Sequence, residues 1–214
     1  MNLSVRGSTL VLALSLAGTT LCEEKKQTGP ERGSGFTSLF DDKTLTGWHV
    51  MNQGQFSVKG GVIFLNKGSG WLRSDKQYQD FELRMDFRFL HKGANSGIFF
   101  RASKEGSNYP ARNYQVQTMD HPSIGSIYSA GRVAPKEKKD PGLVKKTLKK
   151  PGEWQSYAIT VQGGKVEVRL NDRLITVADG LAITPGYIGI QGEGGQLEIK
   201  NIRIKEQRRK DKTK

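Results

Sequence analysis

Cysteine, histidine and long apolar runs are scarce in this sequence, and each shortage excludes a class of protein. Cys22 is the single cysteine among 214 residues, so no disulfide can form within the chain. With only three histidines beside it, a cysteine-rich structural zinc site is excluded as well. Hydrophobic residues make up 35% of the chain, which is too little for a protein with several membrane spans and enough for one globular core.

The first residues are typical of an export signal. Residues 1–7 carry Arg6 and no acid, and a short apolar run follows over residues 9–17. Ser15 and Ala17 place small side chains at the positions that a signal peptidase inspects. The pattern predicts a signal peptide over residues 1–17 and an exported protein, either periplasmic or secreted.

A polar segment with glycine, proline and mixed charges follows, and it predicts a linker over residues 18–35. Lipidation of Cys22 stays open as an alternative, since it would anchor the mature protein in a membrane. The Thr19-Thr20-Leu21 sequence before that cysteine is a poor match to a bacterial lipobox.

The net charge of +13 is concentrated in two segments. Residues 135–150 hold seven lysines and two acids, a charge of +5, and residues 205–214 hold six basic residues and two acids, a charge of +4. We expect a solvated basic loop, a disordered tail over 207–214, and contact of the loop with an anionic glycan or lipid. No continuous basic face with interleaved aromatic residues is evident, so the sequence does not favour specific binding of nucleic acid.

Alternation of apolar and polar residues with period two dominates the chain after Phe36. It is clearest over residues 81–89 and returns over 157–161 and 166–170, on either side of a Gly-Gly turn. No stretch shows a convincing helical pattern. The sequence therefore predicts an all-β domain over residues 36–206, a two-sheet antiparallel β-sandwich of the jelly-roll type.

Strand parity places a set of polar side chains on faces opposite to apolar ones. Amides and an arginine hydrogen-bond sugar hydroxyls well, whereas lysine and glutamate are the usual choices for solubility. We therefore expect a polar binding groove, with an ordinary solvated sheet face as the alternative. The residues are Asn95 and Arg101 on one strand, Gln115 and Gln117 on a second, and Gln191 and Glu193 on a third. Tyr128 is an expected sugar contact because Ile127 should face the core, and Tyr109 and Arg112 are expected at a lip.

A series of motifs resembles the 3-keto-disaccharide hydrolase domain family, in order from Phe36 to about Glu206. They are Leu39-Phe40-Asp41-Asp42-Lys43, Leu45-Thr46-Gly47-Trp48, Asn95-Ser96-Gly97-Ile98 with Arg101, Tyr114-Gln115-Val116-Gln117 with Asp120, Gly125-Ser126-Ile127-Tyr128, Pro151-Gly152-Glu153-Trp154 and Gly189-Ile190-Gln191. The family is similar in fold to concanavalin A-like lectins and glucanases, whose concave face holds sugar.

The resemblance implies cleavage of sugars already oxidised at carbon 3. The ketone acidifies the C2 proton, a base removes it, and the group on C1 leaves by elimination, after which water can add. In that scheme we expect Arg101 to hold the enolate oxygen and Glu193 or Asp120 to act as the base. Asn95, Gln115, Gln117 and Gln191 would orient the hydroxyls.

Two departures from the family pattern concern the same site. Many members carry Glu where this chain has Gln115, and a His within the segment 191–194, and both are groups that could act as base or metal ligand. A divalent metal ion is therefore left open as a cofactor. A non-catalytic, lectin-like protein that binds carbohydrate in the same groove is the alternative to an enzyme.

Overall fold

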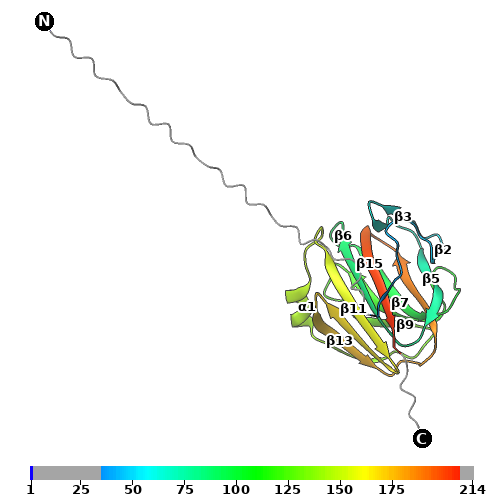
Figure 1. Cartoon of the computed structure of the whole chain (residues 1–214). Coiled ribbons are helices and arrows are strands. Elements are labelled where there is room, and N and C mark those ends of the chain that lie inside the picture. Colours follow the sequence, from blue (N-terminus) through cyan, green and yellow to red (C-terminus); the bar gives the residue numbers. More distant parts are fainter. Residues whose placement is uncertain (2–34, 208–214) are drawn as a thin grey trace.

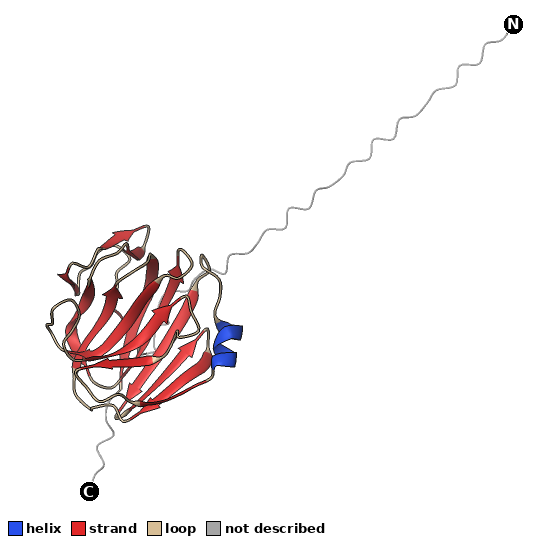
Figure 2. Cartoon of the chain, turned by 180° about the vertical axis from the view of Figure 1, so that it is seen from behind, coloured by secondary structure: helices blue, strands red, loops and turns tan. Residues whose placement is uncertain are grey.

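The computed structural model describes residue 1 and residues 35–207. The predicted signal peptide and nearly all of the predicted linker and tail lie outside these residues. Figures 1 and 2 show two layers of antiparallel strands with one short helix at an edge. The predicted two-sheet antiparallel β-sandwich is confirmed.

The larger sheet has nine strands, of which eight follow the order β10-β13-β12-β11-β6-β15-β4-β3, while β1 pairs with β15. The bounds are β1 (Thr37–Ser38), β3 (Phe56–Lys59), β4 (Val62–Leu65), β6 (Phe81–Phe89), β10 (Lys136–Lys139), β11 (Gln155–Gln162), β12 (Lys165–Leu170), β13 (Arg173–Asp179) and β15 (Leu197–Glu206). Near its centre β6 pairs with β15, which brings the last strand of the chain beside a strand from the first half.

The smaller sheet has six strands in the order β2-β5-β14-β7-β8-β9. The bounds are β2 (Trp48–Asn52), β5 (Gly70–Tyr78), β7 (Asn95–Ala102), β8 (Asn113–Met119), β9 (Ile127–Ala130) and β14 (Gly186–Gly192). Strand β14 lies between β5 and β7, so its polar residues are placed in the middle of the sheet.

The core lies between the two sheets and is built by the alternation seen in the sequence. On β6 the five apolar side chains from Phe81 to Phe89 are each at most 3% exposed, and the charged residues between them face outward. Ile98, Val116 and Ile190 meet them from the smaller sheet. Burial of these faces is the main source of stability for the sandwich, and it fixes which face of the smaller sheet points away from the core.

The basic segment differs from the predicted solvated loop. Its first part is strand β10, which pairs with β13 at the edge of the larger sheet, and its second part is a helix, α1 (Pro141–Thr147). Asp140 caps the helix by accepting a hydrogen bond from the Leu143 amide at 2.9 Å, and Val144 is fully buried. A single turn of apolar periodicity within a lysine-rich run is too short to be recognised in the sequence, which is why no helix was predicted. Between residues 35 and 207 no helix is long and apolar enough to cross a membrane.

Candidate functional site

A row of hydrogen-bonded amides lies on the face of the smaller sheet that points away from the core. Gln115 Nε2 donates to Gln191 Oε1 at 3.1 Å and to Gln117 Oε1 at 2.8 Å. Gln117 Nε2 donates to Asn95 Oδ1 at 2.7 Å, and Asn95 Nδ2 donates to Glu193 Oε2 at 2.8 Å. We call Gln191, Gln115, Gln117, Asn95 and Glu193 the amide row. Strands β7, β8 and β14 and the loop after β14 thus bring together five side chains that sequence parity had placed on polar faces.

Gly97, on the strand that lies between β8 and β14, leaves the space that the amide row needs. Gly97 on β7 pairs with Gln117, and the pair Phe99 and Gln115 follows it. A Cβ atom on Gly97 would lie 2.2 Å from Gln115 Nε2, so the amide occupies the space that a side chain would take. Gln115 therefore reaches across β7 to Gln191 on β14, its partner two strands away.

The loop after β14 positions Glu193 at the end of the row. The backbone N–H of Asn95 donates to the Gly194 carbonyl at 2.8 Å, which ties this loop to the start of β7. Gly195 has φ +127°, and a Cβ there would lie 2.6 Å from Ala94 Cα, so the close approach requires glycine. Glu193 is exposed, whereas Gln117 and Gln191 are 7% and 6% exposed. The row is therefore a largely buried polar floor that ends in one accessible carboxylate.

An apolar cluster borders the row on the same face of the sheet. Trp71 and Phe99 meet edge to face with ring centroids 5.8 Å apart, and Tyr109 packs on Phe99 with centroids 5.9 Å apart. Tyr109 comes from the loop between β7 and β8, and its hydroxyl donates to the Gly192 carbonyl at 3.1 Å. An aromatic residue inside a polar loop between two strands of the site was the only sequence signal for this position.

Two other predicted residues lie near the row without joining its hydrogen bonds. Tyr128 on β9 pairs with Gln115 across the strands and is 49% exposed. The Asp120 carboxylate, just after β8, accepts a hydrogen bond from the backbone N–H of Gly93 at 3.1 Å. This bond joins the end of β8 to the turn between β6 and β7. Tyr128 is thus available for a ligand, whereas Asp120 already has a structural partner.

Arg101 does not belong to this site, and the prediction that it shares a face with Glu193 is wrong. Its guanidinium is fully buried, pairs with Asp80 at 2.9 Å and donates to the carbonyls of Gln79, Gly163 and Ala182. Asn95, which contacts Glu193, stands at the other end of β7, six residues away and on the order of 20 Å along the strand. Arg101 is a structural residue that joins three turns.

A β-bulge explains the error. Three steps along β7, from Phe99 to Ala102, face two steps along β14, from Gly189 to Tyr187. Arg101 takes the extra position with φ +48°, so alternation breaks there and Ala102 joins the outer cluster in its place. Nothing in the local sequence marks this bulge, since arginine is not a residue that favours positive φ.

The donor set of the row does not fit a divalent metal ion. Glu193 is the one carboxylate in it, and the side-chain oxygens of Gln117, Gln191 and Asn95 already accept hydrogen bonds from neighbouring amides. Hard divalent cations take several oxygen ligands, with carboxylates among them. Within the described residues there is also no cluster of three His, Cys, Asp or Glu side chains that could hold a metal.

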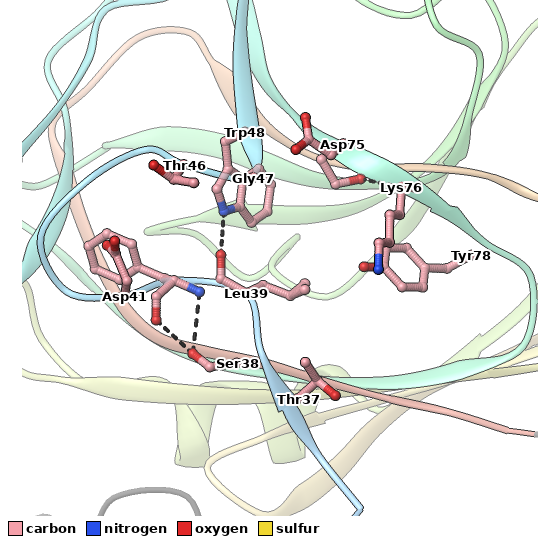
Figure 3. A pocket seen from close by; sticks show the side chains of 12 residues that line it. Thr37, Ser38, Leu39, Asp41, Thr46, Gly47, Trp48, Asp75, Lys76 and Tyr78 are labelled. Carbon is pink, nitrogen blue, oxygen red and sulfur yellow. Dashed lines mark hydrogen bonds between the residues drawn. The ribbon is translucent and has the colours of Figure 1, made fainter.

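A separate cavity of about 320 Å³ lies between the N-terminal segment and β5 (Figure 3). Trp48 forms part of its wall and donates from Nε1 to the Leu39 carbonyl at 2.6 Å. Tyr78 lines the opposite side, and none of the amide-row residues lines the cavity. Trp48 therefore serves packing at this edge of the sandwich and has no contact with the row.

Several known proteins are similar to this chain in sequence or in fold. A curated 3-keto-disaccharide hydrolase from Bacteroides thetaiotaomicron is 25% identical over 232 residues, covering 82% of this chain and 80% of that protein. A solved structure from Parabacteroides distasonis, described provisionally as a glycosyl hydrolase, has a TM-score of 0.65 at 23% identity and covers 83% of this chain and 96% of its own. The carbohydrate binding module CBM66 from Bacillus subtilis has a TM-score of 0.54 at 15% identity, over 74% and 95% of the two chains.

The sequence also matches a family model over residues 35–205, nearly the whole described domain. These matches at low identity to the solved structures establish the fold, and the family model covers the motifs that carry the amide row. The chain belongs to the 3-keto-alpha-glucoside-1,2-lyase-like domain family.

Proposed function

We propose that this protein is a carbohydrate-processing enzyme that cleaves 3-keto-glycosides by elimination at C1 and C2. The observation that carries the proposal is the amide row, a polar floor of four amides that ends in the exposed Glu193 carboxylate. Family membership and the activity named for the Bacteroides relative support it. The substrate would reach the site already oxidised at C3.

The row suits a sugar because amide groups offer donors and acceptors at the spacing of neighbouring hydroxyls. Both hydrogens of the Gln115 amide are used within the row, so Gln115 holds the other amides in place. Gln191 and Gln117 then present fixed polar atoms to a ligand, and Tyr128 offers an exposed aromatic ring beside them. Ordering the amides in advance lowers the entropic cost of binding a flexible polyol.

The chemistry requires one base, which the row supplies. The Glu193 carboxylate takes the proton from C2, and the C–H electron pair forms an enolate with the C3 carbonyl. When the enolate collapses, the C1–O bond breaks with its electron pair, and the proton passes from Glu193 to the leaving oxygen. Addition of water to the resulting C1–C2 double bond would complete a net hydrolysis.

Glu193 is the first choice of base because it is exposed and oriented by Asn95. Asp120, the second carboxylate predicted for this role, already accepts a hydrogen bond from the Gly93 amide. Asp120 is also half-buried, and its carboxylate bonds to the β6–β7 turn rather than to the amide row, so it is placed less well than Glu193 to reach a sugar held by the row.

Export is part of the proposal and rests on the N-terminal sequence, with lipidation of Cys22 as the alternative way to hold the protein at a membrane. The exposed lysines of β10 and α1, among them Lys138 and Lys145, are suited to an anionic glycan or lipid by charge alone.

The test is turnover of a 3-keto-glucoside by the purified protein and by the Glu193→Gln variant. We expect the variant to lose about two to four orders of magnitude in rate and to keep its affinity, because it removes a base and leaves the hydrogen-bonding shape. Glu153→Gln, an exposed change near β11 in the larger sheet, is the matched control. EDTA should leave the rate unchanged, since the donor set does not fit a divalent metal.

Two results would contradict the proposal. Binding of the sugar without any turnover by the parental protein would identify the lectin-like alternative. Parental turnover by Glu193→Gln would place the base elsewhere.

A further inference from the structure

Tyr109 lies over the outer face of the smaller sheet with its hydroxyl directed at the end of the amide row. The hydroxyl donates to the carbonyl of Gly192, the residue directly before Glu193. The ring is held beside Phe99 in the apolar cluster. The phenol is thus the polar end of an otherwise apolar wall.

The loop that carries Tyr109 is fixed on both sides of it. Asn113 Nδ2 donates to the Pro110 carbonyl at 2.8 Å, and Asn52 Nδ2 donates to the Asn108 carbonyl at 2.9 Å. A Cβ on Gly106 would lie 1.9 Å from the Tyr109 carbonyl oxygen, so the loop closes on itself at that point. The ring is therefore held in place, while rotation about the C–O bond can redirect the hydroxyl hydrogen.

The electrostatic surroundings keep the phenol protonated. Burial raises the pKa of the Tyr109 hydroxyl, and the negative charge of Glu193 raises this pKa further, while contacts with the side chains of Gln191 and Ser69 act in the opposite direction. The hydroxyl bonds to the carbonyl of Gly192, which lies between Gln191 and Glu193 in the sequence, so it stands at the end of the amide row. At neutral pH Tyr109 is therefore a protonated hydrogen-bond donor.

We propose that Tyr109 is a catalytic residue whose hydroxyl donates a hydrogen bond to the C3 oxygen of the sugar as the enolate forms. The inference rests on the proposed function and deepens it. The C2 proton moves to Glu193, the electron pair moves to the C3 oxygen, and the phenol keeps its own proton while it stabilises that oxygen. Negative charge thus moves from the Glu193 carboxylate to the C3 oxygen, to which Tyr109 donates. Tyr109 thereby takes the role that we had expected for Arg101.

The first test compares Tyr109→Phe with Tyr187→Phe, a change in the same apolar cluster. Loss of one oxyanion donor should lower kcat by about 10²- to 10³-fold, with KM and the melting temperature close to the parental values. The control should keep the parental kcat. If Tyr109→Phe turns over at the parental rate, or if its loss of activity follows a loss of folded protein, the inference is overturned.

A second measurement separates a catalytic phenol from one that only closes the loop. Replacing Tyr109 by a fluorinated tyrosine lowers the pKa of the phenol with little change in shape. The alkaline limb of the kcat profile should then move to lower pH, because a phenolate cannot donate to the enolate oxygen. An unmoved limb would show a structural role.

Failure of the proposed function gives a different result. In that case the parental protein itself shows no turnover of the 3-keto-glucoside, whereas failure of this inference leaves parental turnover intact and Tyr109→Phe equally active.

Discussion

At the scale of single residues, Arg101 and Glu193 show how burial decides what a charged side chain does. Arg101 has no exposed surface, and its donors are taken up by Asp80 and by three backbone carbonyls. Glu193 is exposed and has one amide partner, so it remains open to a ligand. A buried ion pair that is fully hydrogen-bonded fixes the structure around it, and removing one member leaves the other uncompensated.

We therefore predict that Arg101→Met destabilises the protein and leaves the chemistry of the folded fraction intact. The change removes the cation that pairs with Asp80 and the side-chain donor to three carbonyls, so the free energy of unfolding should fall by about 3–5 kcal/mol. Urea unfolding measures this loss. The control is Lys165→Met, which breaks the exposed pair with Glu167 and should leave the urea midpoint close to the parental value. A parental urea midpoint for Arg101→Met, or a stable variant with greatly reduced turnover, would contradict the prediction.

At the scale of elements, strand alternation predicted most of the sandwich, and the exceptions have local physical causes. Strand β6 and the hairpin β11–β12 follow from period two because each has one buried face. Strand β5 was missed, since its first five residues, Gly70 to Ser74, are all buried and show no alternation. The amide row follows from parity, but Arg101 could not be placed, because the bulge in β7 depends on pairing with β14.

The dependence of the row on a glycine in β7 gives a prediction for that strand. Gly97→Ala would place a methyl group 2.2–2.7 Å from the Gln115 side chain, from Nε2 to Cγ, so this flexible side chain has to turn away as a whole. The fold should therefore lose little stability, while the hydrogen bonds from Gln115 to Gln117 and Gln191 break. We expect sugar affinity to fall by about tenfold, equivalent to one lost hydrogen bond of about 1.4 kcal/mol, as measured by calorimetry.

Gly194→Ala is the matched control for this prediction, because a Cβ at that position meets no atom within 4 Å. It should bind sugar like the parental protein. Equal affinities for the two variants would show that the row does not hold the ligand.

At the scale of the whole molecule, the two sheets are joined by polar contacts as well as by the apolar core. Tyr157 on β11 reaches across the core, and its hydroxyl donates to the Gln117 carbonyl on β8 at 3.0 Å. The larger sheet thereby fixes the backbone of a residue in the amide row. A rigid layer behind the site is what keeps its polar atoms in place without a ligand.

This buried phenol makes stability depend on alkaline pH. Burial strongly raises the pKa of Tyr157, as it raises the pKa values of Tyr78 and Tyr109, whereas an unfolded tyrosine titrates near pH 10. Above about pH 10 the unfolded chain loses protons that the folded chain keeps, so the unfolded state binds fewer protons and the free energy of unfolding falls as pH rises. For the fully buried Tyr157 the slope is about 1.4 kcal/mol per pH unit above pH 10, and below that pH this group adds no dependence.

We predict that Tyr157→Phe removes this part of the slope. The variant should be less stable than the parental protein by about 1 kcal/mol at pH 8, because the hydrogen bond to the Gln117 carbonyl is lost. Between pH 10 and pH 11 its stability should fall less steeply than that of the parental protein, so the two curves converge. Urea unfolding at half-unit steps from pH 8 to pH 11 measures both effects, and lysine titration cancels in the comparison because both chains carry the same lysines. Parallel curves over this range would mean that Tyr157 titrates alike in the folded and unfolded chain. The predicted linkage between its ionisation and the stability of the fold would then be wrong.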